Sequence, residues 1–515
     1  MRQIAYGLAL FLSSACGLII EIVAGRLLAP YVGMSLYTWT AIIAVVLSGL
    51  SAGHWIGGRL AAADVDAAKG GRRIAFALAL AAVSSLGSLV LLRTLSGFLL
   101  TVGLTPIPAI VLLTTSLFLL PSLFVGIVSP ILTKLAVDAR PGQHGHVIGR
   151  MYALGTLGSI AGTLAAGYLF ISWIGSTGTV ITVALVYSLL ALAFAIADPL
   201  RLLVLLLLAG GGGTFVLWGN TLKAFQSPCT VESDYFCIRI ADFSADSGRE
   251  SNLMVLDHLV HSINDRRDPG YLYSPYIQFV DEVVKLRFQD TWDSGKSAPA
   301  AFFIGGGGYS LPRAWAADYP KSKLTVAEID PAVTAQARKS LWLDDQHPAL
   351  TIFHRDARAV LQSLPRMPQF DVIFGDAFHD ISIPSHLVTQ EFHAEVAVRL
   401  KPGGFYALNV VDKGSNPRFL FSLIKTLKED FPRVEAWINR EDNGNTGRVT
   451  FVVLASDRAT SEAALMSLRG PERSWVRWPE KDLSQRIARS KSPVLTDDYA
   501  PVDRLMSGLL LDDVP

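Results

Sequence analysis

Long apolar stretches fill the first part of the chain and are typical of helices that cross a lipid bilayer. Seven of them are long enough to span a hydrocarbon core of about 30 Å, and we expect the spans at residues 4–29, 37–58, 73–95, 108–133, 149–173, 178–197 and 201–219. A cleaved signal peptide does not explain the first stretch, because further spans follow it and no small-residue cleavage site ends it. The pattern therefore predicts a multi-pass helical membrane domain.

The pattern changes after residue 222. Short alternating segments with Gly, Ser and Asp turns predict a small antiparallel β-domain, and residues 271–288 look helical. From residue 300, apolar strands alternate with helices, which predicts a parallel, doubly wound α/β sheet of the Rossmann-like, methyltransferase type. We divide the chain into a membrane domain, a β-domain with a connecting helix, and a nucleoside-binding catalytic domain, at residues 1–222, 223–290 and 291–515.

Charge is unevenly distributed between these parts. Residues 1–222 hold only 11 of the 45 Lys and Arg residues and 5 of the 44 Asp and Glu residues, and the mean hydropathy of the chain is +0.38. This composition excludes a purely soluble protein, and no basic run suggests a nucleic-acid partner. Lys and Arg gather in the loops 59–73 and 134–148, which predicts that these loops and the N-terminus face the cytoplasm. With seven spans, the soluble part then faces outward.

Cysteines and intramembrane charges add two open questions. Cys229 and Cys237 are eight residues apart and either form a disulfide across a hairpin, which requires an oxidising compartment, or are two free buried thiols. A cofactor made in the cytoplasm would favour the opposite side, so the side of the soluble part stays open. Glu21 and Arg26 lie within the first span, where they form either a substrate path or a helix-packing pair.

Side chains suited to a nucleoside follow three consecutive predicted strands. Gly305, Gly306 and Gly307 end the first strand, and their lack of Cβ atoms lets a ligand approach the backbone. Glu328 ends the second strand, where an acid can accept both ribose hydroxyls, and Asp356 ends the third, placed for an adenine amino group. Carboxyl ends of parallel strands line one sheet edge, so this order predicts a nucleoside site. The absence of GKS or GKT excludes a P-loop, and the dinucleotide fingerprint lacks its third glycine.

The motifs in this order resemble the spermidine synthase family, and their fusion to apolar spans resembles its membrane-fused branch. The resemblance covers about residues 228–455, and a further match lies in the tail. The matching segments are ESDYFCIRI, LDHLVHS, IGGGGYSLPR (304–313), VAEIDP (327–332), RDAR (355–358), FDVIFGDAF (370–378), KPGG (401–404) and LTDDYAPVDRL (495–505).

The resemblance implies an aminopropyltransferase, in which decarboxylated S-adenosylmethionine gives its aminopropyl group to a polyamine-type amine and methylthioadenosine is released. It implies that Asp376 anchors the amine and accepts its proton. A family Tyr that positions the amine falls among three tyrosines, of which we select Tyr276. The remaining residues that the resemblance assigns are Gly305, Gly306, Gly307, Glu328, Asp330, Asp356 and Ala357 for the co-substrate, and His261 and Tyr271 for the amine.

Two positions depart from the family pattern. Gly308 stands where the family has an Asp that contacts the aminopropyl amine, and His379 replaces a second acid, with Asp380 beside it. Fewer acids weaken the case for a diamine such as putrescine. His379 and Asp380 are either a general base pair with a place in the amine site, or a surface His near a helix start with its neighbour.

Two other functions stay open beside the aminopropyltransferase. Gly308 favours a methyltransferase that uses S-adenosylmethionine itself, because methyl transfer has no aminopropyl amine to bind. Glu21 and Arg26 favour a polyamine transporter or sensor with a non-catalytic nucleoside-binding domain. For the aminopropyltransferase we expect a small-molecule amine and the lipid bilayer as partners, no metal, no nucleic acid, and a place in the inner membrane. A homodimer is left open.

Overall fold

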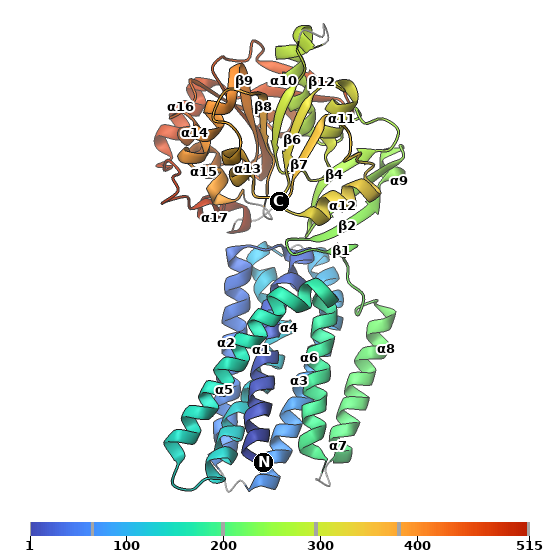
Figure 1. Ribbon diagram of the computed structural model, residues 1–515, viewed down its shortest axis with the longest axis vertical. Coiled ribbons are helices and arrows are strands. Elements are labelled where there is room, and N and C mark those ends of the chain that lie inside the picture. The colour runs from blue at the N-terminus through green and yellow to red at the C-terminus, as the bar shows by residue number, and fades with distance from the viewer. Residues whose placement is uncertain are drawn as a thin grey trace. The chain divides into compact units, whose positions relative to one another are not determined.

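The chain forms two compact units, Met1–Cys237 and Ile238–Pro515. The computed structural model describes residues 2–62, 66–102, 104–196, 201–292, 297–378 and 383–511. Each unit has a hydrophobic core of its own, built from apolar side chains of the helices in the first unit and from the sheet and its covering helices in the second (Figure 1). The division into three parts at residues 222 and 290 stays a prediction.

The first unit is almost entirely helical. Its elements are α1 (Arg2–Val32), α2 (Leu36–Ala62), α3 (Ala67–Val102), α4 (Pro106–Asp138), α5 (His144–Ala165), the π-helix η1 (Ala166–Phe170), α6 (Ile171–Ala195), α7 (Arg201–Leu206), the π-helix η2 (Leu207–Gly212), α8 (Gly213–Thr221) and the short strand β1 (Val231–Glu232).

Six helices among the described residues are long and apolar enough to cross a membrane, where seven spans were predicted. The difference arises at the fifth helix, His144–Ala195, whose 52 residues would extend about 78 Å if straight. Gly175 interrupts it with a φ of 71°, and Figure 1 shows the arms α5 and α6 meeting in a bend. The fifth and sixth predicted spans are therefore the two arms of one bent helix.

Small residues in the two glycine-rich stretches 49–58 and 158–167 let pairs of helices approach closely. A Cβ atom at Gly53 of α2 would lie 2.2 Å from the carbonyl oxygen of Leu123 in α4. A Cβ atom at Gly158 of α5 would lie equally close, at 2.2 Å, to the carbonyl oxygen of Phe11 in α1. Backbone contact of this kind is the usual role of small residues between membrane helices, and it makes α2 with α4 and α1 with α5 tight pairs.

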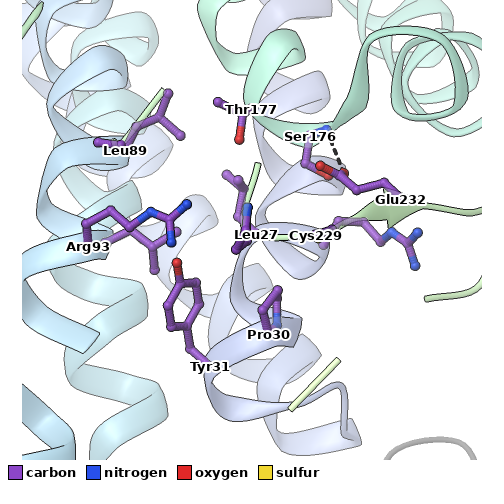
Figure 2. Close-up of a pocket in the computed structure, with 13 residues that line it drawn as sticks. Leu27, Pro30, Tyr31, Leu89, Arg93, Ser176, Thr177, Cys229 and Glu232 are labelled. Atoms are coloured by element: carbon purple, nitrogen blue, oxygen red, sulfur yellow. Dashed lines mark hydrogen bonds between the residues drawn. The ribbon is translucent and has the colours of Figure 1, made fainter. Parts of the chain in front are cut away.

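The bend at Gly175 is held by a carboxylate from β1. Glu232 Oε2 accepts the backbone N–H of Ser176 at 2.8 Å, the first residue after the bend (Figure 2). Glu232 Oε1 accepts a hydrogen bond from the hydroxyl of Ser227 at 2.6 Å. A negative charge next to free N–H groups at a helix start is favourable, so Glu232 stabilises the start of the second arm.

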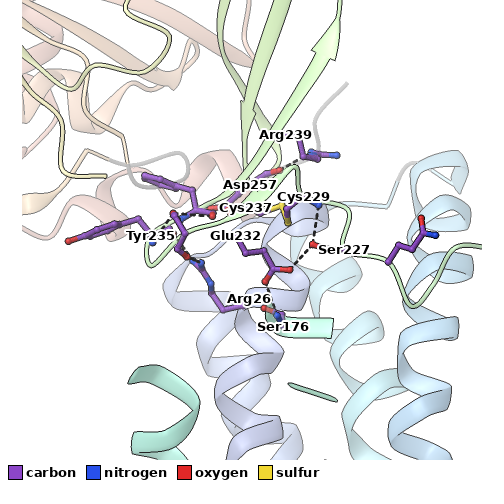
Figure 3. The surroundings of a disulfide bond; sticks show 12 residues. Arg26, Ser176, Ser227, Cys229, Glu232, Tyr235, Cys237, Arg239 and Asp257 are labelled. Atoms are coloured by element: carbon purple, nitrogen blue, oxygen red, sulfur yellow. Dashed lines mark hydrogen bonds between the residues drawn. A yellow bond between two sulfur atoms is a disulfide. The ribbon is translucent and has the colours of Figure 1, made fainter. Parts of the chain in front are cut away.

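A disulfide closes the segment that carries Glu232. Cys229 and Cys237 are bonded, with their Cα atoms 5.2 Å apart, which decides between the disulfide and the free thiols. Arg26 of α1 donates to the carbonyl oxygen of Tyr235 at 2.6 Å and also to that of Ser233 (Figure 3). Arg26 therefore binds the disulfide-closed segment, a packing role. In Figure 1, β1 lies at one end of the helical unit, and the N-terminus of α1 lies at the opposite end.

The second unit begins with a small antiparallel meander and continues as an α/β domain. The elements of the meander and its connecting helix are β2 (Cys237–Asp242), α9 (Ser244–Ser247), β3 (Ser251–Leu256), β4 (Leu259–Asp265) and α10 (Pro275–Trp292). Those of the α/β domain are β5 (Ala300–Ile304), α11 (Ser310–Asp318), β6 (Lys323–Ala327), α12 (Pro331–Ser340), β7 (Leu350–Phe353), α13 (Ala357–Ser363), β8 (Phe370–Gly375), η3 (Ser385–Leu387), α14 (Gln390–Arg399), β9 (Leu400–Lys413), α15 (Arg418–Leu427), β10 (Arg433–Asn439), η4 (Arg440–Asp442), β11 (Arg448–Ser456), β12 (Ala464–Ser467), β13 (Arg473–Arg477), α16 (Glu480–Arg489), α17 (Val502–Leu505) and α18 (Gly508–Leu511).

The predicted parallel sheet is confirmed and is part of a larger mixed sheet. The strand order is β12-β13-β10-β11-β9-β8-β5-β6-β7. The five strands from β9 to β7 are parallel, and β11, β10, β13 and β12 continue the sheet with antiparallel pairing. The order reverses between β5 and β8, the point in such sheets where ligands bind beyond the carboxyl ends of the strands.

Candidate active site

Glu328, which follows β6, binds the glycine run that follows β5. Its Oε2 accepts the backbone N–H of Gly306 at 2.8 Å and that of Gly307 at 3.2 Å, while Oε1 accepts the N–H of Asp330 at 2.9 Å. Burial raises the pKa of Glu328, and these three donors act in the opposite direction by favouring the carboxylate. The structure thus brings Glu328 to the glycines. Its role in ribose binding stays a prediction.

Asp330 and Asp356 each begin a helix. Asp330 is 1% exposed, and its Oδ1 accepts the N–H of Ala332 at 2.8 Å as the N-cap of α12. Asp356 caps α13, which starts at Ala357, by accepting the N–H of Ala359 at 3.0 Å. Asp356 is therefore the N-cap of α13. Its predicted contact with adenine, and those of Asp330 and Ala357 with the co-substrate, stay predictions.

The second oxygen of Asp356 faces a histidine. Oδ2 of Asp356 lies 2.7 Å from Nε2 of His386, which belongs to η3. Burial by itself raises the pKa of Asp356, but the hydrogen bonds from His386 and from the N–H groups of Ala359 and Arg358, with the charge of His386, together outweigh it, and the pKa lies below its ordinary value. Asp356 is therefore a carboxylate at neutral pH, able to accept hydrogen bonds from a ligand.

Asp376 lies at the end of β8, next to the glycine run. Its backbone N–H donates to the carbonyl oxygen of Ile304 at 2.9 Å, which fixes it to the end of β5. Its Oδ2 accepts the hydroxyl of Tyr276 at 3.1 Å, and its Oδ1 accepts the side-chain N–H of Asn409 at 2.9 Å. The structure therefore brings together Asp376 and Tyr276, which are 100 residues apart in the chain.

Burial raises the pKa of Asp376 to about 7, against the effect of the hydrogen bonds from Asn409 and Tyr276, which lower it. A carboxyl group with a pKa near the working pH is suited to accept and release a proton. The pKa of Tyr276 is raised far above its ordinary value by burial and by the neighbouring charge of Asp376. Tyr276 is therefore a neutral donor, and Asp376 is the group of this pair that titrates.

Ser262 of β4 explains why Gly308 departs from the family pattern. The N–H of Gly308 donates to Ser262 Oγ at 2.7 Å, and a Cβ atom at Gly308 would lie 2.4 Å from Ser262 Cβ. Asn264, two residues further along β4, donates to the carbonyl oxygen of Gly308 at 2.7 Å. An acidic side chain at position 308 would therefore require β4 to move.

His261 and Tyr271 are the other described residues that the resemblance assigns to the amine. His261 neighbours Ser262 on β4, and burial, together with the charges of His258 and Arg448, lowers its pKa to about 4. The ring of Tyr271 lies under the guanidinium of Arg249, 4.0 Å from its centroid, which is a structural contact. Substrate contacts of both residues stay predictions. His379 and Asp380 lie outside the described residues.

Asn409 and Ser262 are the site residues that sequence reasoning missed. Asn409 is 5% exposed, and its Oδ1 has no hydrogen-bond partner among the described residues. It is the one polar residue in the apolar run FYALNVV of β9, a signal that could have identified it. Ser262 lies in the motif LDHLVHS, directly after the residue that we selected.

The tail motif has a structural role. Asp497 in LTDDYAPVDRL accepts two hydrogen bonds from Arg358 of α13, both at 2.6 Å, and a third from Thr389 at 2.7 Å. Paired bonds between a guanidinium and a carboxylate are strong and directional. The tail therefore binds α13, the helix that Asp356 caps, and stabilises its position.

Comparisons with known proteins agree with this geometry. No family model matches the chain. A "Polyamine aminopropyltransferase" of Vibrio vulnificus (strain CMCP6) is 36% identical over 107 residues, 21% of this chain and 36% of the relative. A "Probable polyamine aminopropyl transferase" of Bifidobacterium longum (strain NCC 2705) is 28% identical over 241 residues, 42% of this chain and 52% of the relative. The matches thus span about a third to a half of these curated relatives.

Among solved structures, a "probable spermidine synthase" from Corynebacterium glutamicum ATCC 13032 has a TM-score of 0.44 and 21% identity, covering 53% of this chain and 97% of its own. The spermidine synthase from Thermotoga maritima has a TM-score of 0.31 and 19% identity, covering 44% and 71%. The two sequence matches confirm the resemblance drawn from the motifs, at modest identity.

Proposed function

We propose that this chain, a relative of the polyamine aminopropyltransferases with six long apolar helices at its N-terminus, is an integral-membrane aminopropyltransferase. Its co-substrate would be decarboxylated S-adenosylmethionine and its acceptor an amine. The observation that carries the proposal is the setting of Asp376, a buried carboxyl with a pKa of about 7 beside the glycine run. Such a group can take a proton from an amine next to a bound nucleoside.

The residues present fit the co-substrate. Glu328 and Asp356 supply carboxylate oxygens at the ends of β6 and β7, and Glu328 binds the backbone N–H groups of the glycine run. Burial of Glu328, which is 6% exposed, keeps water from competing for its oxygens, which makes hydrogen bonds to ribose stronger. We assign the ribose to Glu328 and the adenine to Asp356.

Asp376 and Asn409 would hold the acceptor. Oδ1 of Asn409 is a buried acceptor that lacks a donor among the described residues, and leaving such an atom unpaired is unfavourable. An amine N–H supplies that donor while a second N–H points to Asp376. Tyr276 then fixes the orientation of the Asp376 carboxylate through its hydroxyl.

The transfer itself is a displacement at carbon. The amine nitrogen donates its lone pair to the carbon next to the sulfonium, the carbon–sulfur bond breaks, and its electron pair stays on sulfur as the neutral thioether of methylthioadenosine. The proton lost by the amine passes to Asp376 and then to water. Alignment of the amine with this carbon supplies part of the rate, and Asp376 supplies the proton acceptor.

Methyl transfer is a second candidate function, and one observation favours it. Ser262 fills the space where an acid at position 308 would contact an aminopropyl amine. S-adenosylmethionine-dependent methyl transfer to an amine needs no such contact. Purified protein given each co-substrate with a panel of amines separates the two, because methylthioadenosine marks aminopropyl transfer and S-adenosylhomocysteine marks methyl transfer. Neither product with any amine would contradict both enzymes and favour a binding protein.

We place the protein in the inner membrane with residues 229–237 on the outer face. The disulfide Cys229–Cys237 requires an oxidising compartment, and the basic loops belong to the opposite side. The bent helix would then cross the membrane twice, which gives an odd number of crossings before β1. Labelling of intact cells with a membrane-impermeant maleimide, on single cysteines placed at Ser227 and at Gln143, tests this orientation. Labelling at residue 143 alone would overturn it.

A further inference from the structure

A cavity of about 320 Å³ opens among α1, α2, α4 and α5. Its lining comes from residues 10–18 of α1, 50–54 of α2, 125–133 of α4 and 148–159 of α5. Ile148 and Tyr152 at its edge are 50% and 79% exposed, so it opens sideways to the surroundings of the helices. In a membrane, these surroundings are lipid.

Four hydroxyl groups in this lining make no hydrogen bond among the residues that the structure describes, namely those of Ser14, Ser129, Thr133 and Ser159. Other hydroxyls of the helical unit, such as those of Ser48 and Thr182, donate to the carbonyl oxygen four residues earlier, at 2.7 and 2.9 Å. Water in the bilayer core is too scarce to satisfy polar groups, so unpaired ones are unfavourable there. The four hydroxyls can therefore bind a molecule that enters the cavity.

The chemistry of the lining restricts that partner. In the described part of the cavity wall no Asp, Glu, Lys or Arg occurs, and His54 is the one histidine. A charged group would remain without a counter-ion in a medium of low dielectric constant, which is unfavourable. Leu10, Leu18 and Leu50 make the rest of the wall apolar, which suits a hydrocarbon chain. A polyamine, which carries several positive charges, does not fit this cavity.

We propose that the cavity binds the head of an uncharged, membrane-dissolved molecule that carries a hydroxyl or ester group on a hydrocarbon chain. Its volume is at the lower end of the range for small-molecule sites, enough for a head group whose chain extends into the bilayer through the side opening. The hydroxyls of Ser14, Ser129, Thr133 and Ser159 bind the head, and His54 can serve as donor or acceptor. This site is independent of the nucleoside site and of the proposed transfer reaction.

Photolabelling of the full chain in lipid nanodiscs tests the proposal. The probe is a diazirine-bearing fatty alcohol, compared with a carboxylate and a trimethylammonium of the same chain, and mass spectrometry locates the labelled peptides. We expect the alcohol to label residues 10–18, 125–133 and 148–159 at least several-fold more than either charged probe does. An excess of unlabelled fatty alcohol should abolish this difference. Equal labelling by all three probes would overturn the proposal and indicate lipid contact only.

Variants test whether labelling by the fatty alcohol depends on the unpaired hydroxyls of the cavity. Ser129→Ala with Thr133→Val removes two unpaired hydroxyls at nearly constant volume and should lower alcohol labelling several-fold. Thr182→Val is the matched control, because Thr182 bonds its own helix and lies outside the cavity. Unchanged labelling in a folded double variant would contradict the proposed site. If the double variant does not fold, competition by unlabelled fatty alcohol on the unaltered chain tests the site instead. Alcohol labelling that persists in excess competitor would also contradict the proposed site.

Discussion

The hydroxyl of Tyr276 donates a hydrogen bond to Asp376 at 3.1 Å, joining the start of α10 to the end of β8. This contact connects Tyr276, selected from three neighbouring tyrosines, with Asp376, the acid expected to accept the amine proton. It also makes the ionisation of Asp376 depend on a neutral donor, because a hydrogen bond to the carboxylate favours the charged form.

Replacing Asp376 by Asn should lower turnover by at least ~10²-fold, the usual size of a general-base effect, while nucleoside binding is retained. The reason is that the amide cannot take the amine proton. Product formation and calorimetric binding measure the two properties. Asp371→Asn is the matched control. Asp371 lies at the start of β8, the strand whose end carries Asp376, and it forms an ion pair with Lys401. Equal turnover in Asp376→Asn and the unaltered chain would remove Asp376 from the mechanism.

Replacing Tyr276 by Phe should move the acidic limb of the pH–rate profile to higher pH. In the unaltered chain we expect this limb near pH 7, where Asp376 ionises. Loss of the Tyr276 hydrogen bond destabilises the carboxylate and raises the pKa of Asp376, so activity should appear only at higher pH. The profile of kcat/KM between pH 5 and about 9 measures the shift. A limb at the same pH in both proteins would show that the hydroxyl does not act on Asp376.

The raised pKa of Asp376 also predicts a pH-dependent stability. In the unfolded chain this carboxyl ionises near its ordinary pKa, and in the folded chain only near 7. The folded state therefore loses stability, relative to the unfolded state, as the pH rises from about 4 to about 7. Asp376→Asn should reduce this loss, measured as the change in Tm over the same range. Asp412, with a pKa also raised to about 7 by burial, should account for a similar part. An identical pH dependence with and without Asp376 would contradict the shifted pKa.

Replacing Glu328 by Gln should weaken binding of the nucleoside while the fold persists. The amide keeps one oxygen for the N–H groups of Gly306 and Gly307, but it loses the charge and one acceptor for ribose hydroxyls. Each lost hydrogen bond to a charged group corresponds to about 1.5–3 kcal/mol, so we expect affinity to fall roughly tenfold or more. Calorimetry with methylthioadenosine measures it. Unchanged affinity would contradict the ribose assignment.

Replacing Cys229 and Cys237 together by Ser should destabilise the helical unit. The disulfide closes the segment whose Glu232 binds the bend at Gly175 and whose carbonyls bind Arg26. Loss of a disulfide in a short loop costs about 2–4 kcal/mol, so a lower Tm in detergent is expected. Arg26→Lys, which removes the forked contact to two carbonyls, should lower it less. An unchanged Tm in the double variant would show that the segment does not support the helices.

The sequence predicted the features that depend on local pattern. Apolar length indicated the membrane helices, and strand–helix alternation indicated the sheet and placed Gly305, Glu328, Asp356 and Asp376 at its ends. It did not indicate that Gly175 bends one long helix into two arms, because the carboxylate that holds the bend comes from a residue 57 positions away, Glu232. The partner of Asp376 in β9 was missed for a similar reason. Asn409 acquires its role only through the pairing of β8 with β9.

The disulfide has a practical consequence for anyone who wishes to separate the two units. A protease that cuts between residues 229 and 237 leaves both products covalently joined until a reductant is added. On a non-reducing gel the nicked protein would therefore migrate with the intact chain. Release of the second unit requires a cut outside the loop, before Cys229 or after Cys237, or a cut inside the loop followed by reduction.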